Sequence, residues 1–266
     1  MKCNRKVTLP NGRTEVIASD LRRNLNLNYL RYTNKTRSVG IHDLPALACD
    51  TQVLPDFIAL YGQPSTYHKT LLTAVGFWEY DNVFDGIHGL YNAIYYDDKK
   101  LLNVYRERFK GVRIFFTPDY SQFGDVDDLE EHYRLKKARV VGLWLAVELH
   151  AVVIPFITMP TPASIDFALD GLEDCHVAAF STKGYVGNCS EREILKRMIQ
   201  LTVDKLNLHS IVVYDVCKDN SAVEDIFSYA YERGIKVVVP NNTLKERNVL
   251  KASGWDAVRT GVANER

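Results

Sequence analysis

The feature that most constrains this chain is the alternation, from about residue 73 onward, of short apolar runs with segments of helical periodicity. Such alternation is typical of α/β proteins built from β/α units around a largely parallel sheet, either open or closed into a partial barrel. The apolar runs are rich in Val, Ile and Phe, as expected for strands that helices cover on both faces. The predicted strands are residues 75–80, 112–117, 151–157, 176–180, 210–214 and 236–239.

Helix-capping patterns lie between these runs. Asp125 is predicted to cap a helix that reaches Leu149, because Asp at this position bonds the first free backbone N–H groups. Ser190 and Glu193 have the spacing of a capping box and predict the start of a second helix. These signals support the same β/α order.

The first 40 residues read differently from the rest. Residues 7–9 and 14–17 flank Pro10-Asn11-Gly12, a turn sequence that predicts a small hairpin, and a short helix is expected over residues 20–29. We therefore divide the chain into an N-terminal segment (1–40), an α/β domain (41–258) and a polar tail (259–266).

The net charge is zero, but it is unevenly distributed. Residues 1–40 contain nine Lys or Arg, among them Arg5, Lys6, Arg22 and Arg23, against two acidic residues. This segment therefore attracts polyanions, and the remainder of the chain repels them. One interpretation is weak nucleic-acid contact through Arg5, Lys6, Arg22 and Arg23; the other is that the segment folds back on the acidic body.

Several classes of protein lack their sequence signals. The apolar runs are much shorter than the roughly 20 residues that cross a bilayer, and the basic start is not followed by the apolar stretch of a secretory signal. The five cysteines are scattered and form no C-x-x-C pair, and the histidines form no H-E-x-x-H motif. We expect a cytoplasmic protein with reduced thiols and no contact with a membrane.

Ligands of parallel α/β proteins usually bind beyond the carboxyl ends of the strands. Polar residues follow the predicted strands at these positions, and Asp81, Asp119 and Asp215 are separated by whole β/α units. If they converge, they suit either a shared Mg²⁺ ion or an acid/base pair. The alternative is that each aspartate only caps a helix or closes a turn.

The sequence Ser181-Thr182-Lys183-Gly184 places hydroxyls, a cation and a flexible glycine before a predicted helix, as in an anion-binding loop. It lacks the spacing of a Walker motif, and acidic residues already occupy the following helix start, so an ordinary loop is the competing interpretation.

The chain also resembles an uncharacterised bacterial, prophage and mobile-element family, a domain of unknown function. The resemblance covers about residues 45–245 and rests on the order of several motifs: residues 115–121, residues 138–145 with Trp144, the turn at Asp170-Gly171-Leu172, residues 181–184 and residues 212–214. It implies no activity. The third predicted strand departs from the family, because Pro155-Phe156-Ile157-Thr158 stands where the family has polar residues.

Two functions follow as hypotheses. The first is a pocket at the strand ends for a small-molecule or phosphate ligand, formed by Asp81, Asp119, Ser121, Ser181, Thr182, Lys183, Gly184 and Asp215. Within it, Asp119, Asp215 and Lys183 are the candidate catalytic residues for metal-assisted or acid/base hydrolysis of a phosphate or sugar bond, and Asp81, Asp119 and Asp215 are the candidate ligands of Mg²⁺. The second is a non-catalytic module that binds protein or, through its basic N-terminal segment, nucleic acid.

Overall fold

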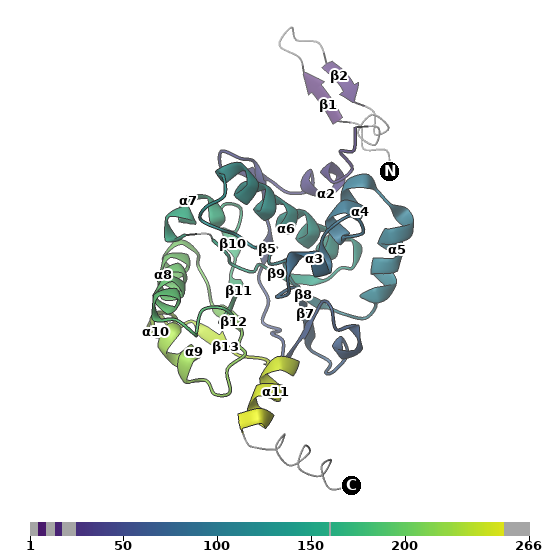
Figure 1. The fold of residues 1–266 in the computed structure, drawn as a ribbon. Helices are drawn as coiled ribbons and strands as arrows, with labels where there is room; N and C mark the ends of the chain where they lie inside the picture. Colours follow the sequence, from purple (N-terminus) through teal and green to yellow (C-terminus); the bar gives the residue numbers. More distant parts are fainter. Residues whose placement is uncertain (1–4, 9–13, 18–24, 160, 253–266) are drawn as a thin grey trace, which may run out of the picture.

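The computed structural model describes residues 5–8, 14–17, 25–159 and 161–252 (Figure 1). Strands β1 (Arg5–Thr8) and β2 (Thr14–Ile17) pair antiparallel, which confirms the predicted hairpin. Residues 25–29 form turns rather than the expected helix, and the next helix is the single turn α2 (Leu30–Thr33). The remainder of the helix expected over residues 20–29 lies outside the described residues.

Parallel strands form the centre of the α/β domain. Five of them pair in the order β14 (Asn241–Asn242), β6 (Phe57–Leu60), β7 (Thr73–Gly76), β8 (Ile114–Phe116) and β9 (Val152–Ile154). Three more pair in the order β11 (Val177–Ser181), β12 (Ser210–Tyr214) and β13 (Lys236–Val238). Every neighbouring pair in these two sheets is parallel, which confirms the fold class.

The two sheets join into a closed circuit of strands. On one side, Phe156 just beyond β9 forms a parallel bridge with Ala179 of β11. On the other side, only two residues separate β13 from β14, which pairs with β6. The strands therefore run around the domain as in a β/α barrel, with a single-residue bridge at one junction and the continuous chain from β13 to β14 at the other.

Aromatic side chains fill the interior at the carboxyl ends of the strands. The ring of Trp78, after β7, stacks on Tyr214 at the end of β12, with centroids 4.6 Å apart. Phe116 of β8 and Phe156 also contact the Trp78 ring, at 4.7 and 5.5 Å. Because β7 and β12 are not neighbours in either sheet, this contact crosses the interior of the circuit. The interior at this end of the barrel is thus a packed core.

Helices surround the strands (Figure 1). The longest, α6 (Asp128–Glu148), contains the fully buried Trp144, which confirms that this stretch belongs to the core. The other helices of the described residues are α3 (Asp81–Phe84), α4 (Leu90–Tyr96), α5 (Lys99–Arg108), α7 (Ile165–Ala168), α8 (Cys189–Lys205), α9 (Ser221–Ile226), α10 (Ser228–Glu232) and α11 (Thr243–Ala252), with 3-10 turns η1 (Pro64–Thr66) and η2 (Pro162–Ser164).

Short strand pairs outside the barrel complete the fold. Strand β3 (Ser38–Val39) pairs antiparallel with β4 (Leu44–Pro45), and β5 (Ala48–Cys49) pairs parallel with β10 (Asp174–Cys175). The latter pair ties the segment before β6 to the turn before β11, so the N-terminal part of the domain is fixed against its C-terminal half.

Some sequence predictions were wrong in detail. The predicted strands did not include β6, which lies between prolines Pro55 and Pro64 and which the structure buries between β7 and β14. The cap of α6 is Asp127, whose side chain accepts from Glu130 N–H, and not Asp125. The cap of α8 is Asn188, which accepts from the N–H of Ser190, so the capping-box prediction at Ser190 was also wrong. In both helices the cap lies within two residues of the predicted one, since several residues that can cap occur together.

Candidate functional site

Asp81, the first residue of α3, is held by groups from two other elements. Its Oδ1 accepts hydrogen bonds from the backbone N–H and the hydroxyl of Ser121, at 3.2 and 2.9 Å. Its Oδ2 lies 2.8 Å from Nη1 of Arg134 on α6. The same Arg134 nitrogen donates to the Ser121 carbonyl at 2.9 Å. Asp81 and Ser121 are therefore in contact, and Arg134 balances the charge of the carboxylate.

Asp119 follows β8 and is half-buried. Within the described part of the chain, its carboxylate forms no hydrogen bond or ion pair. Burial raises the pKa of Asp119 from 3.8 to about 7, with a further upward contribution from the Asp81 charge and an opposing one from Lys183. A carboxyl group with such a pKa exchanges its proton near neutral pH, which suits general acid/base chemistry.

The loop after β11 is ordered by its own hydrogen bonds. Ser181 Oγ accepts from the backbone N–H of Lys183 at 3.0 Å, and Lys183 Nζ donates to the Trp78 carbonyl at 2.8 Å. Gly184 has φ +94°, a conformation that side chains other than glycine rarely adopt, and the space beside its Cα is open. The loop therefore presents the Lys183 ammonium toward the end of β7 and brings its charge near Asp119.

Asp215, after β12, is fully buried. Its Oδ1 accepts from the Thr182 hydroxyl at 2.7 Å and from the backbone N–H of Cys217 at 3.3 Å. Its Oδ2 forms an ion pair with Lys245 Nζ at 3.0 Å. The Asp215 carbonyl also accepts from the Asn242 side chain at 2.7 Å. The ion pair with Lys245 therefore holds α11 against the barrel, and the Thr182 hydroxyl holds the Asp215 carboxylate in place.

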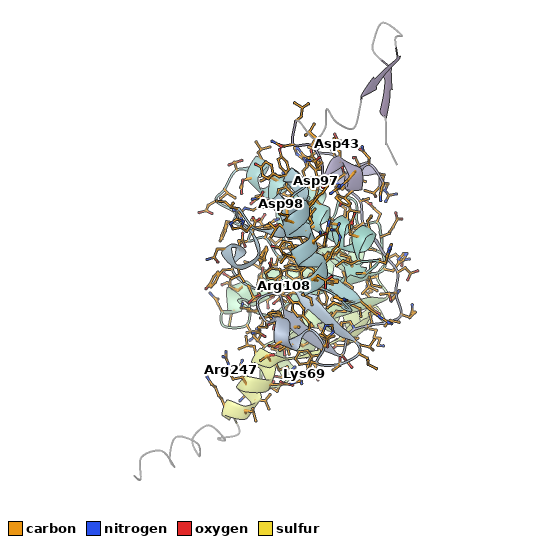
Figure 2. All side chains as sticks on the ribbon, turned by 90° about the vertical axis from the view of Figure 1, so that its right-hand side faces the viewer. Asp43, Lys69, Asp97, Asp98, Arg108 and Arg247 are labelled. Carbon is orange, nitrogen blue, oxygen red and sulfur yellow. The ribbon has the colours of Figure 1, made fainter. Side chains whose placement is uncertain are left out.

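An open groove of about 280 Å³ lies at the carboxyl ends of β6, β7, β11 and β14. Two cations line it, Lys183 and Arg247, together with the carboxylate of Glu79. Figure 2 labels Arg247 on α11, close to Lys69 and at the end of the molecule opposite Asp97 and Asp98. The remaining lining residues are Leu60, Gln63, Tyr80, Val83, Thr243 and Leu244.

Charged groups of the groove also act on the barrel interior. The Tyr214 hydroxyl and the Trp78 indole N–H are buried, and neither has a hydrogen-bond partner among the described residues. Burial raises the pKa of Tyr214, the Glu79 charge raises it further, and the Arg247 charge lowers it. The groove is therefore next to polar groups that the protein itself leaves unsatisfied.

The structure separates the predicted site residues into two groups. Asp81, Asp119, Ser121 and Lys183 share one part of the rim, whereas Asp215 and Thr182 are enclosed by Lys245 and α11. In residues 25–159 and 161–252, no group of three or more His, Cys, Asp or Glu is placed to hold a metal ion. The geometry therefore gives no support to a Mg²⁺ ion shared by Asp81, Asp119 and Asp215, and that assignment stays a prediction.

Sequence reasoning missed three charged residues of the rim. Glu79 was included in the predicted strand 75–80, although β7 ends at Gly76. Arg134 and Arg247 lie on helices, where a charged residue is usually solvated and gives no signal of its role. Only the strand boundary, set by the small Gly76 before a run of aromatic residues, offered a sequence signal for Glu79.

The basic N-terminal segment is partly paired with the acidic body. Arg31 forms an ion pair with Asp97 at 2.6 Å, and Arg37 pairs with Glu173 and Asp174 at 2.9 and 3.1 Å. Of the predicted nucleic-acid-binding residues, Arg5 and Lys6 lie on β1, and Arg22 and Arg23 lie outside the described residues. The pairs of Arg31 and Arg37 favour the interpretation in which the segment folds back, and nucleic-acid contact stays a prediction.

The fold and the rim define a parallel β/α protein with charged side chains at the carboxyl ends of its strands. The chain belongs to the family described as Domain of unknown function (DUF4417), which matches residues 36–240. Comparison with curated proteins and with solved structures gives no match. Among the described residues, no helix is both long enough and apolar enough to cross a membrane.

Proposed function

We propose that the rim binds a small phosphate or sugar ligand and hydrolyses it by acid/base catalysis. The observation that carries the proposal is the groove of about 280 Å³ in which Lys183 and Arg247 supply two cations, and the charge of Lys183 also acts on the carboxyl group of Asp119. Small-molecule sites are typically clefts of this kind with a few convergent polar groups.

Each residue has a distinct role in this proposal. Lys183 and Arg247 hold the anionic group of the ligand, and Asp119 accepts a proton from the attacking water. The water oxygen bonds to phosphorus or to the anomeric carbon, the bond to the leaving oxygen breaks, and that oxygen takes a proton from solvent. Water is the only co-reactant, and the hydrolysis needs no oxidant or reductant.

The packing around Asp119 supports this role. Arg134 pairs with Asp81 at 2.8 Å, whereas Asp119 has no hydrogen-bond or ion-pair partner among the residues that the structure describes. Two neighbouring carboxyl groups in different environments are a common arrangement for acid/base work. Asp81 thus acts as a positioning residue that orders Ser121 and contributes to the raised pKa of Asp119.

The test combines binding and turnover. Calorimetry with glucose 6-phosphate measures binding, and p-nitrophenyl phosphate and p-nitrophenyl glycosides measure hydrolysis. Arg247→Ala should weaken binding about tenfold or more, the loss of a charge-assisted hydrogen bond. Asp119→Asn should keep binding and lose turnover by a factor on the order of 10² to 10⁴.

The matched control is Lys236→Ala, which removes one exposed cation from the start of β13, at the opposite ends of the strands. It should change neither binding nor turnover. Hydrolysis that survives Asp119→Asn, or binding that Lys236→Ala weakens as much as Arg247→Ala, would show that the groove is not the site.

A further inference from the structure

Glu79 is a carboxylate held at the wall of the groove. Its Oε2 accepts a hydrogen bond from the backbone N–H of Gly62 at 2.6 Å. A Cβ atom at Gly62 would lie 2.5 Å from Glu79 Oε1, so any larger residue there would displace the carboxylate. Among the described residues, Glu79 forms no ion pair, and its Oε1 forms no hydrogen bond. Glu79 therefore has an acceptor oxygen available for a ligand.

Two cations line the same groove without being paired to Glu79. Lys183 Nζ donates to the Trp78 carbonyl at 2.8 Å, and Arg247 is exposed on α11. Neither cation forms an ion pair within the described part of the chain. The lining thus carries one net positive charge, and it presents donors for an anion together with an acceptor for a hydroxyl. A ligand that matches these groups carries an anionic group and hydroxyl donors, as a phosphorylated sugar does.

Apolar side chains form the other part of the groove. Tyr80 is 85% exposed and Val83 is 42% exposed, and the half-buried Leu60 and Leu244 line the groove as well. A sugar phosphate has no apolar surface to cover these residues. An exposed aromatic ring is a surface on which a nucleobase stacks, and one such contact strengthens binding by about 5- to 150-fold. The groove therefore matches a ligand in which a flat heterocycle is joined to the sugar phosphate.

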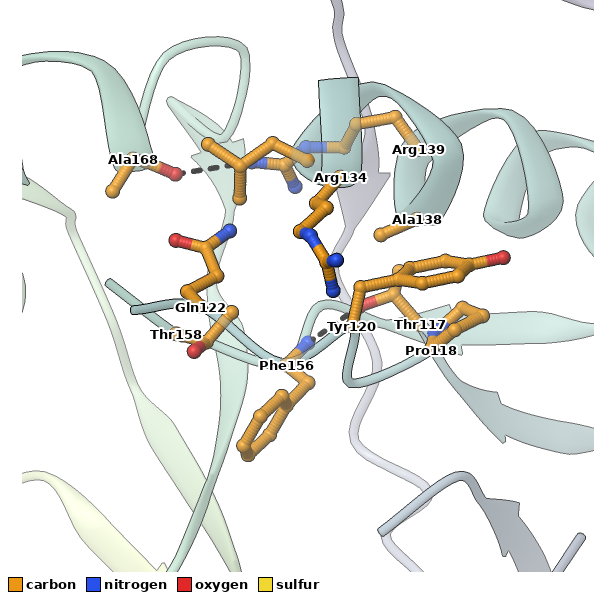
Figure 3. Close-up of a pocket in the computed structure, with 11 residues that line it drawn as sticks. Thr117, Pro118, Tyr120, Gln122, Arg134, Ala138, Arg139, Phe156, Thr158 and Ala168 are labelled. Carbon is orange, nitrogen blue, oxygen red and sulfur yellow. Dashed lines mark hydrogen bonds between the residues drawn. The ribbon is translucent and has the colours of Figure 1, made fainter. Parts of the chain in front are cut away.

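The space at the rim favours the same groove. The groove offers about 280 Å³, close to the lower end of the range of small-molecule sites, and it is open to solvent. The cavity lined by Gln122, Arg134 and Arg139 offers about 10 Å³, enough for one water molecule (Figure 3). A ligand with a sugar, a phosphate and a base therefore fits the groove and not this cavity.

We infer that the ligand of the groove is a nucleoside monophosphate. Lys183 and Arg247 bind its phosphate group, and Glu79 accepts hydrogen bonds from its ribose hydroxyls. The ring of Tyr80 stacks on its base, a contact that every base can make. This inference rests on the proposed function, because it assigns the ligand of the same groove, but it gives no role to Asp119.

Calorimetry with the full chain tests the assignment. The probes are AMP, GMP, CMP and UMP. Each nucleotide should bind about 5-fold or more tightly than ribose 5-phosphate, which lacks the base. AMP should also bind about tenfold or more tightly than 2′,3′-dideoxyadenosine monophosphate, which lacks the hydroxyls that donate to the charged Glu79.

The outcomes separate this inference from the proposed function. If ribose 5-phosphate binds as tightly as the nucleotides and Arg247→Ala weakens both, the nucleotide assignment is overturned and the groove remains a site for phosphorylated sugars. If no nucleotide binds, the assignment is also overturned, and binding of glucose 6-phosphate then decides separately whether the proposed function stands. If nucleotides bind as expected but hydrolysis survives Asp119→Asn, only the proposed catalysis fails.

Variants of Tyr80 test the stacking contact. Because the side chain is 85% exposed, its replacement should leave the fold intact. Tyr80→Ala should weaken AMP binding by about 5-fold or more and leave ribose 5-phosphate binding unchanged, whereas Tyr80→Phe keeps the ring and should keep the affinity. The matched control is Tyr96→Ala, which removes a 57% exposed tyrosine next to Asp97, at the end of the molecule opposite Arg247 (Figure 2). Equal AMP affinity in Tyr80→Ala and the parent would contradict the assignment.

Glu79→Gln tests the contact with the ribose. Glutamine keeps an acceptor for the Gly62 N–H and removes the charge, so AMP binding should weaken about tenfold and most of the difference from the dideoxy analogue should disappear. Arg113→Ala is the control for location, because Arg113 lines a cavity of about 850 Å³ at the amino ends of β7, β8 and β9. If Arg113→Ala weakens AMP binding and Glu79→Gln does not, the nucleotide binds in that cavity and the assignment to the groove is wrong.

Discussion

The rim after β8 and the rim after β12 differ in one respect, although both place an aspartate just beyond a parallel strand. Asp215 is enclosed by the Thr182 hydroxyl, the Cys217 N–H and the Lys245 ammonium, and both its oxygens are used. Asp119 has no such partner among the described residues, and burial raises its pKa to about 7. The same residue type in the same topological position is therefore structural at one strand and chemically available at the other.

The difference lies in the partners, which the strand pattern does not encode. Lys245 reaches Asp215 from α11, which contacts β14, whereas the charged groups that act on Asp119 are the carboxylate of Asp81 and the exposed Lys183. A strand-end aspartate indicates function only when the surrounding elements leave it unpaired.

The largest expected effect is at Asp215. Lys245→Met leaves the buried carboxylate without its countercharge and should lower the free energy of unfolding by about 3–5 kcal/mol. Chemical denaturation measures the free energy of unfolding of the variant and of the parent. The double variant with Asp215→Asn should recover part of the loss; a single variant as stable as the parent would show that Asp215 needs no countercharge.

Asp119→Asn should raise the free energy of unfolding, and the size of this increase should depend on pH. Since the folded-state pKa is raised from 3.8 to about 7, the folded protein keeps a proton that the unfolded chain has released. The parent therefore loses stability as pH rises from about 4 to 7, and the loss is complete above this range. The variant should be about 2 kcal/mol more stable than the parent at pH 8, a difference that already allows for the partial solvent access of Asp119. Near pH 4 the two proteins should be equally stable. Parallel stability profiles for the two proteins would contradict the account.

Lys183→Met should change the free energy of unfolding less than Asp119→Asn does. The Lys183 charge lowers the pKa of Asp119, so its removal should raise that pKa further and move the pH-dependent loss of stability upward. Because Lys183 is exposed, solvent screens the interaction, and we expect a change of less than about 1 kcal/mol. Lys236→Met is the control, and an identical shift in it would mean that general charge causes the effect.

Arg37→Ala should change the free energy of unfolding least of all. Its ion pairs with Glu173 and Asp174 are on the surface, so their loss should cost about 0.2–1 kcal/mol, and added salt should reduce this cost. Filter binding of duplex DNA by the parent and the variant tests the alternative function at the same time. Salt-sensitive DNA binding that Arg37→Ala weakens would favour the nucleic-acid interpretation of the basic segment.

Sequence patterns predicted strands best where composition and packing agree. Strand β12 (Ser210–Tyr214) was predicted with its observed bounds, since it contains the apolar run Ile211-Val212-Val213, is buried throughout and lies in the middle of its sheet. Strand β6 was missed because the prolines around it suggested a loop, although its residues are buried. Proline at the ends of a short strand is compatible with the sheet because it only interrupts hydrogen bonding at its own position.

The candidate site was only partly visible in the sequence. Asp81, Asp119 and Ser121 could be placed on one rim because parallel strands end at the same edge of the sheet. The pairing of Asp215 with Lys245 could not be predicted, since it depends on how α11 returns to β6. The departure at Phe156 has a structural explanation, because this ring packs against Trp78 in the barrel interior.

The most direct test of the comparison is an NMR titration of the aspartate side-chain carboxyl carbons in the labelled protein, with Asp119→Asn and Asp215→Asn to assign the two signals. The account predicts a midpoint near pH 7 for Asp119. The signal of Asp215, which is paired with Lys245, serves as the reference for a carboxylate with a partner. A midpoint for Asp119 near the ordinary value of 3.8 would contradict the claim that the rim after β8 holds the chemically available carboxyl group.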